Sequence, residues 1–130
     1  MEKITEEELK EILEQHKLWL GSDGKECKRA DLSSVNLTDA DLTRANLRFA
    51  VLTRANLTGV NLYGADLIGA SLTDADLTRV NLSDANLTRA NLTHANLSGV
   101  DLSDADLAGA DLTCANLRCA NLTHANLYCV

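Results

Sequence analysis

The sequence is poor in the large residues from which most protein cores are built. Its 130 residues include no proline, one Phe, one Trp and two Tyr, and aromatic residues make up only 3% of the chain. Hydrophobic residues still make up 45%, so a core has to be assembled from Leu, Ala and Val. A chain of this length forms one domain and leaves no room for a second core of useful size.

Three further absences exclude classes of protein. No apolar run is long enough to span a bilayer, which excludes a membrane protein. No basic region followed by an apolar stretch opens the chain, so we expect no secretory signal and a cytoplasmic location. The net charge of −7 argues against binding nucleic acid through its phosphates, because such binding needs a basic surface.

The charged residues divide the chain near Ala30. Every Lys and Glu lies before Ala30, whereas the eleven Asp and six Arg that follow it give the remainder a net charge of −5. Such an abrupt change of composition marks a boundary between two structural elements, which we place between residues 1–29 and residues 30–130.

From residue 30 the sequence has a five-residue period that continues to the last residue. Leu occupies every fifth position from Leu32 to Leu127, and Ala or Val stands two residues before each of these leucines. Asn or Asp lies between the two, except at Val51 and Ser71, and Thr or Ser usually follows the Leu.

Neither a helix nor a straight strand buries leucines at this spacing. On a helix successive leucines are rotated by roughly 140°, so they spiral around all sides. On a straight strand an odd period places them on alternate faces. A chain that is extended for about three residues and then turns puts every Leu, with the Ala or Val before it, inside a coil. Neighbouring coils pair as parallel strands about 4.8 Å apart, so the repeat predicts an all-β solenoid.

The repeat resembles that of the pentapeptide-repeat family, whose signature is A-[DN]-L-x-x. The likeness covers residues 30–130 in twenty consecutive units. It implies a right-handed quadrilateral parallel β-helix with four units per coil, and therefore about five coils, in which Leu and the preceding Ala or Val point inward. Val60, Val80 and Val100 replace Ala at intervals of twenty residues, which gives weak support for the four-unit coil.

Residues 1–29 are predicted to form an N-terminal capping helix and its connection to the coil. Thr5–Glu8 fits a capping box, and Leu9, Ile12, Leu13 and Trp19 follow at helical spacing. The first coil of a solenoid exposes backbone edges and core leucines. We therefore expect these four residues to anchor the helix on that coil, with Trp19 as the largest buried anchor. The Glu-rich polar side disfavours a membrane-surface helix.

Two residues near the boundary are expected to have structural roles. His16 lies on the apolar stripe of the helix and is interpreted as a packed histidine rather than a ligand. Cys27 falls five residues before Leu32, in the inward register, which predicts a buried position at the mouth of the solenoid. The four cysteines show no zinc-type pairing, and nothing indicates the secretion that a disulfide framework suits, so we expect free thiols.

The outer surface offers little for catalysis. Residues twenty apart would lie side by side, which places His94 beside Cys114 and Asp104 beside His124, but two ligands are too few for zinc. The Asn and Asp column is predicted to be structural, because such side chains bond to nearby backbone at tight corners. We expect no enzyme activity, no cofactor and no metal.

One group of outward positions departs from the polar pattern. Phe49 and Val51 break the pattern in one unit, Ile68 and Ser71 break it one coil later, and stacking adds Tyr128 on the same side of the square. Grouped exposed apolar residues often mark a binding surface, so these five residues form a candidate partner-binding patch. The alternatives are that the N-terminal segment lies over this side, or that nothing does.

These observations favour a non-enzymatic structural or protein-interaction module whose partner is another protein. The family resemblance supplies an alternative, a DNA-mimicking inhibitor of DNA gyrase or topoisomerase, with which the acidic, narrow rod is compatible. Six arginines and many outward Asn residues argue against it. Because no capping helix follows the last coil in this sequence, we also predict a homodimer through that coil.

Overall fold

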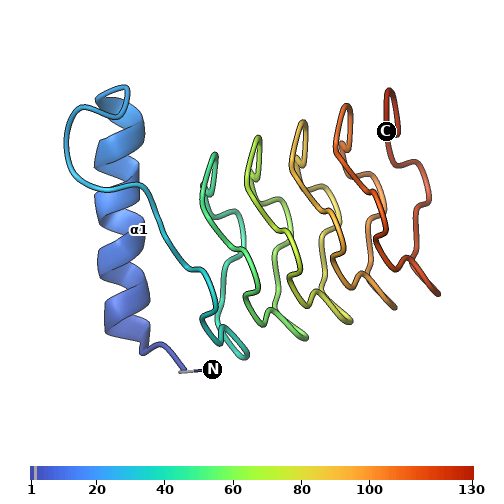
Figure 1. Ribbon diagram of the computed structural model, residues 1–130, viewed down its shortest axis with the longest axis horizontal. Coiled ribbons are helices and arrows are strands. Elements are labelled where there is room, and N and C mark those ends of the chain that lie inside the picture. Colours follow the sequence, from blue (N-terminus) through green and yellow to red (C-terminus); the bar gives the residue numbers. More distant parts are fainter. Residues whose placement is uncertain (2) are drawn as a thin grey trace.

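The computed structural model describes Met1 and residues 3–130. It contains one α-helix, α1 (Glu6–Gly21), a connection over residues 22–29, and a coiled region over residues 30–130 (Figure 1). α1 lies across one end of the stack of coils, and the C-terminus lies at the opposite end (Figure 1).

Each coil of the chain takes twenty residues. From Asp31 to Asp106, the residue before each repeat Leu forms a parallel bridge with the residue twenty positions later. Four units therefore complete one coil, as predicted, and residues 30–130 stack into a quadrilateral parallel β-helix of five coils (Figure 1). We number the coils from the N-terminal end. The sides are numbered by their first bridging residue: side 1 begins at residue 31, side 2 at 36, side 3 at 41 and side 4 at 46.

A tight turn separates each side from the next. The N–H of Ala40 donates to the carbonyl of Leu37 at 2.9 Å, and the same bond recurs in the other units. The residue before that Ala or Val has a positive φ, as in Arg54 at 59°. A side chain in this conformation costs roughly 1–2 kcal/mol. The ladder offsets the cost, because the N–H of Arg54 donates to the carbonyl of Thr73 in the next coil at 2.9 Å.

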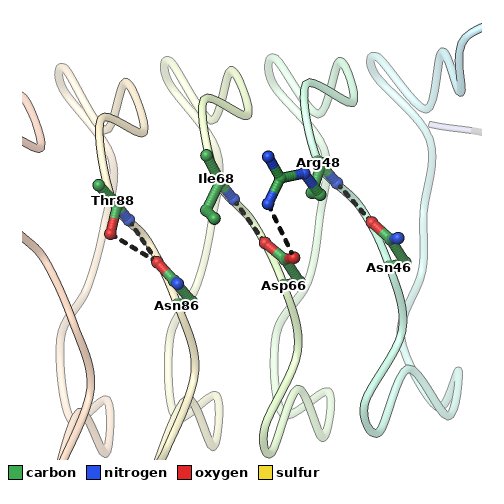
Figure 2. Close-up of polar contacts among 6 residues, drawn as sticks. All are labelled: Asn46, Arg48, Asp66, Ile68, Asn86 and Thr88. Atoms are coloured by element: carbon green, nitrogen blue, oxygen red, sulfur yellow. Dashed lines mark hydrogen bonds and ion pairs between the residues drawn. The ribbon is translucent and has the colours of Figure 1, made fainter. Parts of the chain in front are cut away.

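The Asn and Asp column holds these turns. Its side-chain Oδ1 accepts a hydrogen bond from the backbone N–H two residues later, as Asn86 does from Thr88 at 3.0 Å (Figure 2). Hydrogen bonds of this kind also lower the pKa of the aspartates in the column. Those from Ser33 lower the pKa of Asp31, and those from Thr113 lower the pKa of Asp111. These two carboxylates are structural acceptors whose ionised form is favoured, which suits them poorly to general acid chemistry.

The core is a narrow stack of leucines flanked by Ala and Val. The repeat leucines from Leu32 to Leu107 are fully buried, whereas Leu127 in coil 5 is 44% exposed. Because the bore is filled by one Leu and one small residue per side, it leaves no space for aromatic side chains. This filling explains a hydrophobic chain with so few aromatic residues.

Helix α1 and the residues before it cover coil 1. The predicted capping box is present, with the Glu8 N–H 3.2 Å from Thr5 Oγ1 and the Thr5 N–H 2.9 Å from Glu8 Oε2. Leu9 is buried against the core, and Ile12 and Leu13 pack on it half-buried. Lys3 forms a parallel bridge with Asn36, so the chain adds a short extended segment to side 2 before the helix begins.

Two expectations about the cap are wrong. Trp19 is half-buried rather than the largest buried anchor, because its ring lies beside the backbone of Gly24 in the connection. Cys27 is exposed with a φ of 59°, although the repeat register predicted a buried position. The ladder begins only at Asp31, and Leu9 and His16 of α1 are the side chains buried at this end of the coil.

His16 is the buried polar residue of this junction, as its interpretation as a packed histidine requires. Its Nδ1 accepts a hydrogen bond from the Ala30 N–H at 3.1 Å, and its ring stacks on Trp19 with centroids 5.7 Å apart. Its Nε2 is buried without a hydrogen-bond partner. Burial lowers the pKa of His16; the nearby backbone of Arg48 opposes the shift, and the charge of Arg29 adds to it.

This arrangement predicts a pH-dependent stability. Since the folded-state pKa of His16 lies below its ordinary value of 6.5, the unfolded chain binds the proton more readily. The free energy of unfolding should therefore fall as the pH decreases below about 6.5 and level off once the folded-state pKa is passed. Urea unfolding at pH 7.5 and pH 5.0 measures this loss. His16→Gln should remove most of this loss of unfolding free energy, whereas His94→Gln, at an exposed position, should retain it. An unchanged pH dependence in His16→Gln would contradict the assignment of the loss to His16.

Candidate functional site

The structure does not assemble a metal site from the residues it describes. Across Met1 and residues 3–130, no three His, Cys, Asp or Glu side chains lie close enough together to hold a metal ion. The stacking predicted for Asp104 and His124 is present, with Oδ1 and Nδ1 3.3 Å apart on the surface. The four cysteines are free and exposed.

Two grooves flank α1 where it meets coil 1. One, of about 660 Å³, is lined by Ile4, Ile12 and Val35 together with acidic and basic side chains such as Glu11 and Arg29. The other, of about 530 Å³, lies between the helix and side 2. The mixed charges and open shape of these grooves do not converge on a ligand-sized polar cluster.

The outer surface is organised by four corners, each a column of turns. The fourth corner joins side 4 to side 1 and consists of residues 48–49, 68–69, 88–89, 108–109 and 128–129. At the first turn position, the first corner carries only hydroxyl side chains: Ser33, Thr53, Thr73, Thr93 and Thr113. The fourth corner carries mixed side chains at this position: Arg48, Ile68, Thr88, Ala108 and Tyr128.

The predicted patch is divided between this corner and the next side. Phe49, Ile68 and Tyr128 lie at the fourth corner, as one column of turns. Val51 and Ser71 instead form a bridge with each other on side 1 and are half-buried. The expectation of a single side is therefore wrong, because the chain turns between residues 49 and 51.

Phe49 is held in a defined orientation at the corner. A Cβ placed on Gly69 would lie 2.7 Å from Cδ1 and Cε1 of Phe49, so the ring rests on the glycine of the next coil. The guanidinium of Arg48 lies 5.7 Å from the ring centroid, and its Nη1 lies 3.3 Å from Oδ2 of Asp66 (Figure 2). The ring is nevertheless 42% exposed, so it is available to a partner.

The same arrangement recurs at Arg89. Its Cγ lies 3.6 Å from the position of a Cβ on Gly109, so the stem of the arginine lies over a glycine one coil later. Arg79 and Gly99 repeat this geometry at the second corner. Sequence reasoning missed these pairs, although the signal is present as a long side chain followed by Gly twenty residues later.

Charge also distinguishes the fourth corner. It contains Arg48 and Arg89 and no acidic residue, whereas each other corner contains at least one Asp: Asp74 in the first, Asp39 in the second, and Asp84 and Asp104 in the third. The rod as a whole has a net charge of −5 from eleven Asp and six Arg. The turn positions of the fourth corner are therefore basic and apolar, and the aspartates that border them on side 4, Asp66 and Asp106, bond to the Ile68 and Ala108 N–H groups. This makes the fourth corner the best candidate for a binding surface.

Comparison with known proteins identifies the repeat. The family model for pentapeptide repeats matches residues 30–67, 55–93 and 90–127. No curated protein matches the chain. Among solved structures, a pentapeptide repeat protein of the Arabidopsis thaliana thylakoid lumen is 35% identical, with 75% of this chain and 65% of that one covered and a TM-score of 0.50.

Two further structures are similar. HetL, a pentapeptide repeat protein involved in heterocyst differentiation regulation in the cyanobacterium Nostoc, is 36% identical, with 74% of this chain and 50% of that one covered and a TM-score of 0.34. Full-length QnrB1, a plasmid-mediated fluoroquinolone resistance protein, is 19% identical, with 84% and 64% covered and a TM-score of 0.50. The chain spans less than two thirds of the length of each of these three proteins.

The contact between Phe49 and Gly69 predicts unequal effects of two alanine substitutions. Gly59 and Gly69 have φ values of 69° and 63°, so Ala at either position costs about 1–2 kcal/mol of unfolding free energy. At Gly59 nothing lies within 4 Å of the added Cβ, whereas at Gly69 the Phe49 ring must move.

Gly69→Ala should therefore cost about 0.5–1.5 kcal/mol more than Gly59→Ala, the typical cost of forcing a side chain off its rotamer. Thermal unfolding of the two variants measures this difference. The NMR resonances of the Phe49 ring should shift only in Gly69→Ala. Equal destabilisation with unshifted ring resonances would contradict the contact.

Proposed function

The chain belongs to the pentapeptide-repeat family, and on that premise we propose that it is a non-enzymatic protein-interaction module that binds another protein through its fourth corner. The observation that carries the proposal is the exposure of Phe49 beside Ile68, at a corner whose turn positions carry no acidic residue. Aromatic and Arg side chains are enriched at protein interfaces, and this corner supplies both.

The regular architecture supports a binding role rather than catalysis. The backbone ladder and the leucine core are used throughout the rod, so coils differ chiefly in their outward side chains. His16 of α1 is fully buried where the helix meets coil 1, and no substrate reaches it there. Aspartates such as Asp41 and Asp101 have lowered pKa values because the side chain and backbone of the residues two positions later bond to them.

The proposal also covers the location, the handedness and the oligomeric state of the protein. α1, the helix of the described residues, is neither long nor apolar enough to cross a membrane. We place the protein in the cytoplasm and take its coils to be right-handed, as the family resemblance implies. We also propose a homodimer that forms through coil 5, where Leu127 and Val130 are 44% and 51% exposed. Sedimentation velocity should show the dimer as a species whose amount rises with protein concentration. A monomer at all concentrations would refute it.

A second candidate function is inhibition of DNA gyrase by mimicry of DNA. The observation in its favour is an acidic region around the third corner, where Asp84 and Asp104 are exposed and Asp101 and Asp106 lie on the two adjoining sides. A supercoiling assay distinguishes the two functions. Mimicry predicts inhibition that Asp84→Asn with Asp104→Asn weakens, and no inhibition at micromolar protein removes this candidate.

The interaction proposal predicts that binding depends on the fourth corner. Immobilised wild-type protein should capture at least one protein from a lysate of the source cells, and the double variant Phe49→Ser, Ile68→Ser should lose about tenfold or more of it, because interface energy concentrates in a few apolar and aromatic side chains. Tyr63→Ser is the matched control, since Tyr63 contacts Arg44 at the third corner.

Circular dichroism and thermal unfolding should first show that both variants keep the fold. Capture that survives the double variant, or that Tyr63→Ser reduces equally, would refute the role of the fourth corner.

A further inference from the structure

The fourth corner presents a different outward side chain in each coil along the rod. From coil 1 to coil 5 it carries Phe49, Ile68, Arg89, Ala108 and Tyr128. Phe49 thus lies at one end and Tyr128 at the other, with Arg89 in the middle; Arg48, beside Phe49, is paired with Asp66. Phe49 is 42% and Tyr128 74% exposed, and within Met1 and residues 3–130 Arg89 forms no ion pair.

The N–H groups of this corner in coils 1 to 4 are already used in hydrogen bonds, which limits how a ligand can bind. The Phe49 N–H donates to the Ile68 carbonyl at 2.8 Å, and the Arg89 N–H donates to the Ala108 carbonyl at 3.0 Å. The Gly69 N–H is used in the same way by coil 3. A partner strand finds no free N–H donor along coils 1 to 4 of this corner and cannot complete a ladder there, so its recognition depends on side chains.

The spacing of the coils selects an extended peptide. Coils are about 4.8 Å apart, so Phe49 in coil 1, Arg89 in coil 3 and Tyr128 in coil 5 are about 9.6 Å apart in successive pairs along the rod. Three residues of a polyproline II segment span about 9.3 Å. A peptide that lies along the corner therefore brings every third side chain to this series of residues.

Charge selects the middle residue of that peptide. Arg89 projects from a corner whose turn positions carry no acidic residue, on a rod whose net charge is −5. The adjoining side 4 holds two aspartates that are already engaged: Asp66 pairs with Arg48, and Asp106 accepts hydrogen bonds from the Ala108 N–H and the Asn126 side chain. An acidic side chain is attracted to Arg89 and repelled by the Asp-bearing corners, which favours this strip and sets the register. Arg48 is already paired with Asp66 at 3.3 Å, so Arg89 is the cation available to a ligand.

We propose that the fourth corner binds an extended, acidic peptide segment of a partner protein, with Asp or Glu against Arg89 and apolar residues three positions before and three positions after it. The proposal rests on the interaction function proposed above and specifies the chemistry of the partner. Phe49 with Ile68 receives the first apolar side chain, and Tyr128 receives the second.

A synthetic heptapeptide tests this register. The probe has Leu at positions 1 and 7, Glu at position 4, and Ser and Pro elsewhere, and it is titrated into the ¹⁵N-labelled full chain. Amide shifts should be confined to the fourth corner and to neighbouring residues of sides 4 and 1. Moving Glu to position 3 should weaken binding about threefold or more, because the acid then no longer meets Arg89.

Charge exchange provides the sharpest control. Arg89→Glu should weaken binding about tenfold, and a probe with Lys at position 4 should recover it in that variant. Arg79→Glu is the matched control, because Arg79 lies over Gly99 at 3.7 Å as Arg89 lies over Gly109 at 3.6 Å, but at the second corner. The Arg79 variant should bind the Glu probe within about twofold of wild type.

Shifts spread over other corners, or equal losses in the two arginine variants, would overturn the acidic-peptide inference. If lysate capture still requires Phe49 and Ile68, the proposed function stands without it. If no capture depends on that corner, both fail.

Discussion

The hydrogen-bond ladder between coils is the constraint on which the rest of the structure depends. The Leu32 N–H donates to the Val51 carbonyl at 2.7 Å, and the Val51 N–H donates to the Ala30 carbonyl at 2.9 Å, so each side of a coil is tied to the next. This ladder requires parallel segments in register, and the register requires that every coil take twenty residues. Stacked leucines fill the bore, and the turns tolerate a positive φ at residues as large as Arg44 and Phe49 because the ladder overrides their local preference.

The surface of this molecule is regular, and its exceptions are confined to outward positions. Once core and backbone repeat, neighbouring coils differ mainly in three outward positions per unit, and those positions line up in columns. The fourth corner differs in two ways at once, in its apolar side chains and in its lack of acids. Phe49 lies on Gly69, and Arg89 lies over Gly109. These contacts orient both long side chains although neither one sits in a pocket. A solenoid can therefore present a linear recognition strip although it has no cleft at that place.

The fold was predictable from the sequence because the period itself is the structural signal, and the period begins only at residue 30. Before that point the register fails: Cys27 is exposed, and Trp19 packs on the connection rather than in the core. The capping box at Thr5 was predictable because it is local. The site was predictable only in part. Phe49 and Ile68 stand out as departures from the repeat. The lack of Asp at the turn positions of the fourth corner appears only when residues twenty apart are placed in one column, and the turn before Val51 moves that residue to another side.

The stacking of residues twenty positions apart is the central claim, and a disulfide tests it most directly. In His94→Cys, oxidation should link position 94 to the native Cys114, since stacked residues about 4.8 Å apart lie within reach of a disulfide. Cleavage after Arg89 and Arg118 leaves both positions in one peptide, so mass spectrometry should find that peptide lighter by two hydrogens. A link from position 94 to Cys119 or Cys129, or no intramolecular link, would contradict the four-unit coil and with it the fourth corner.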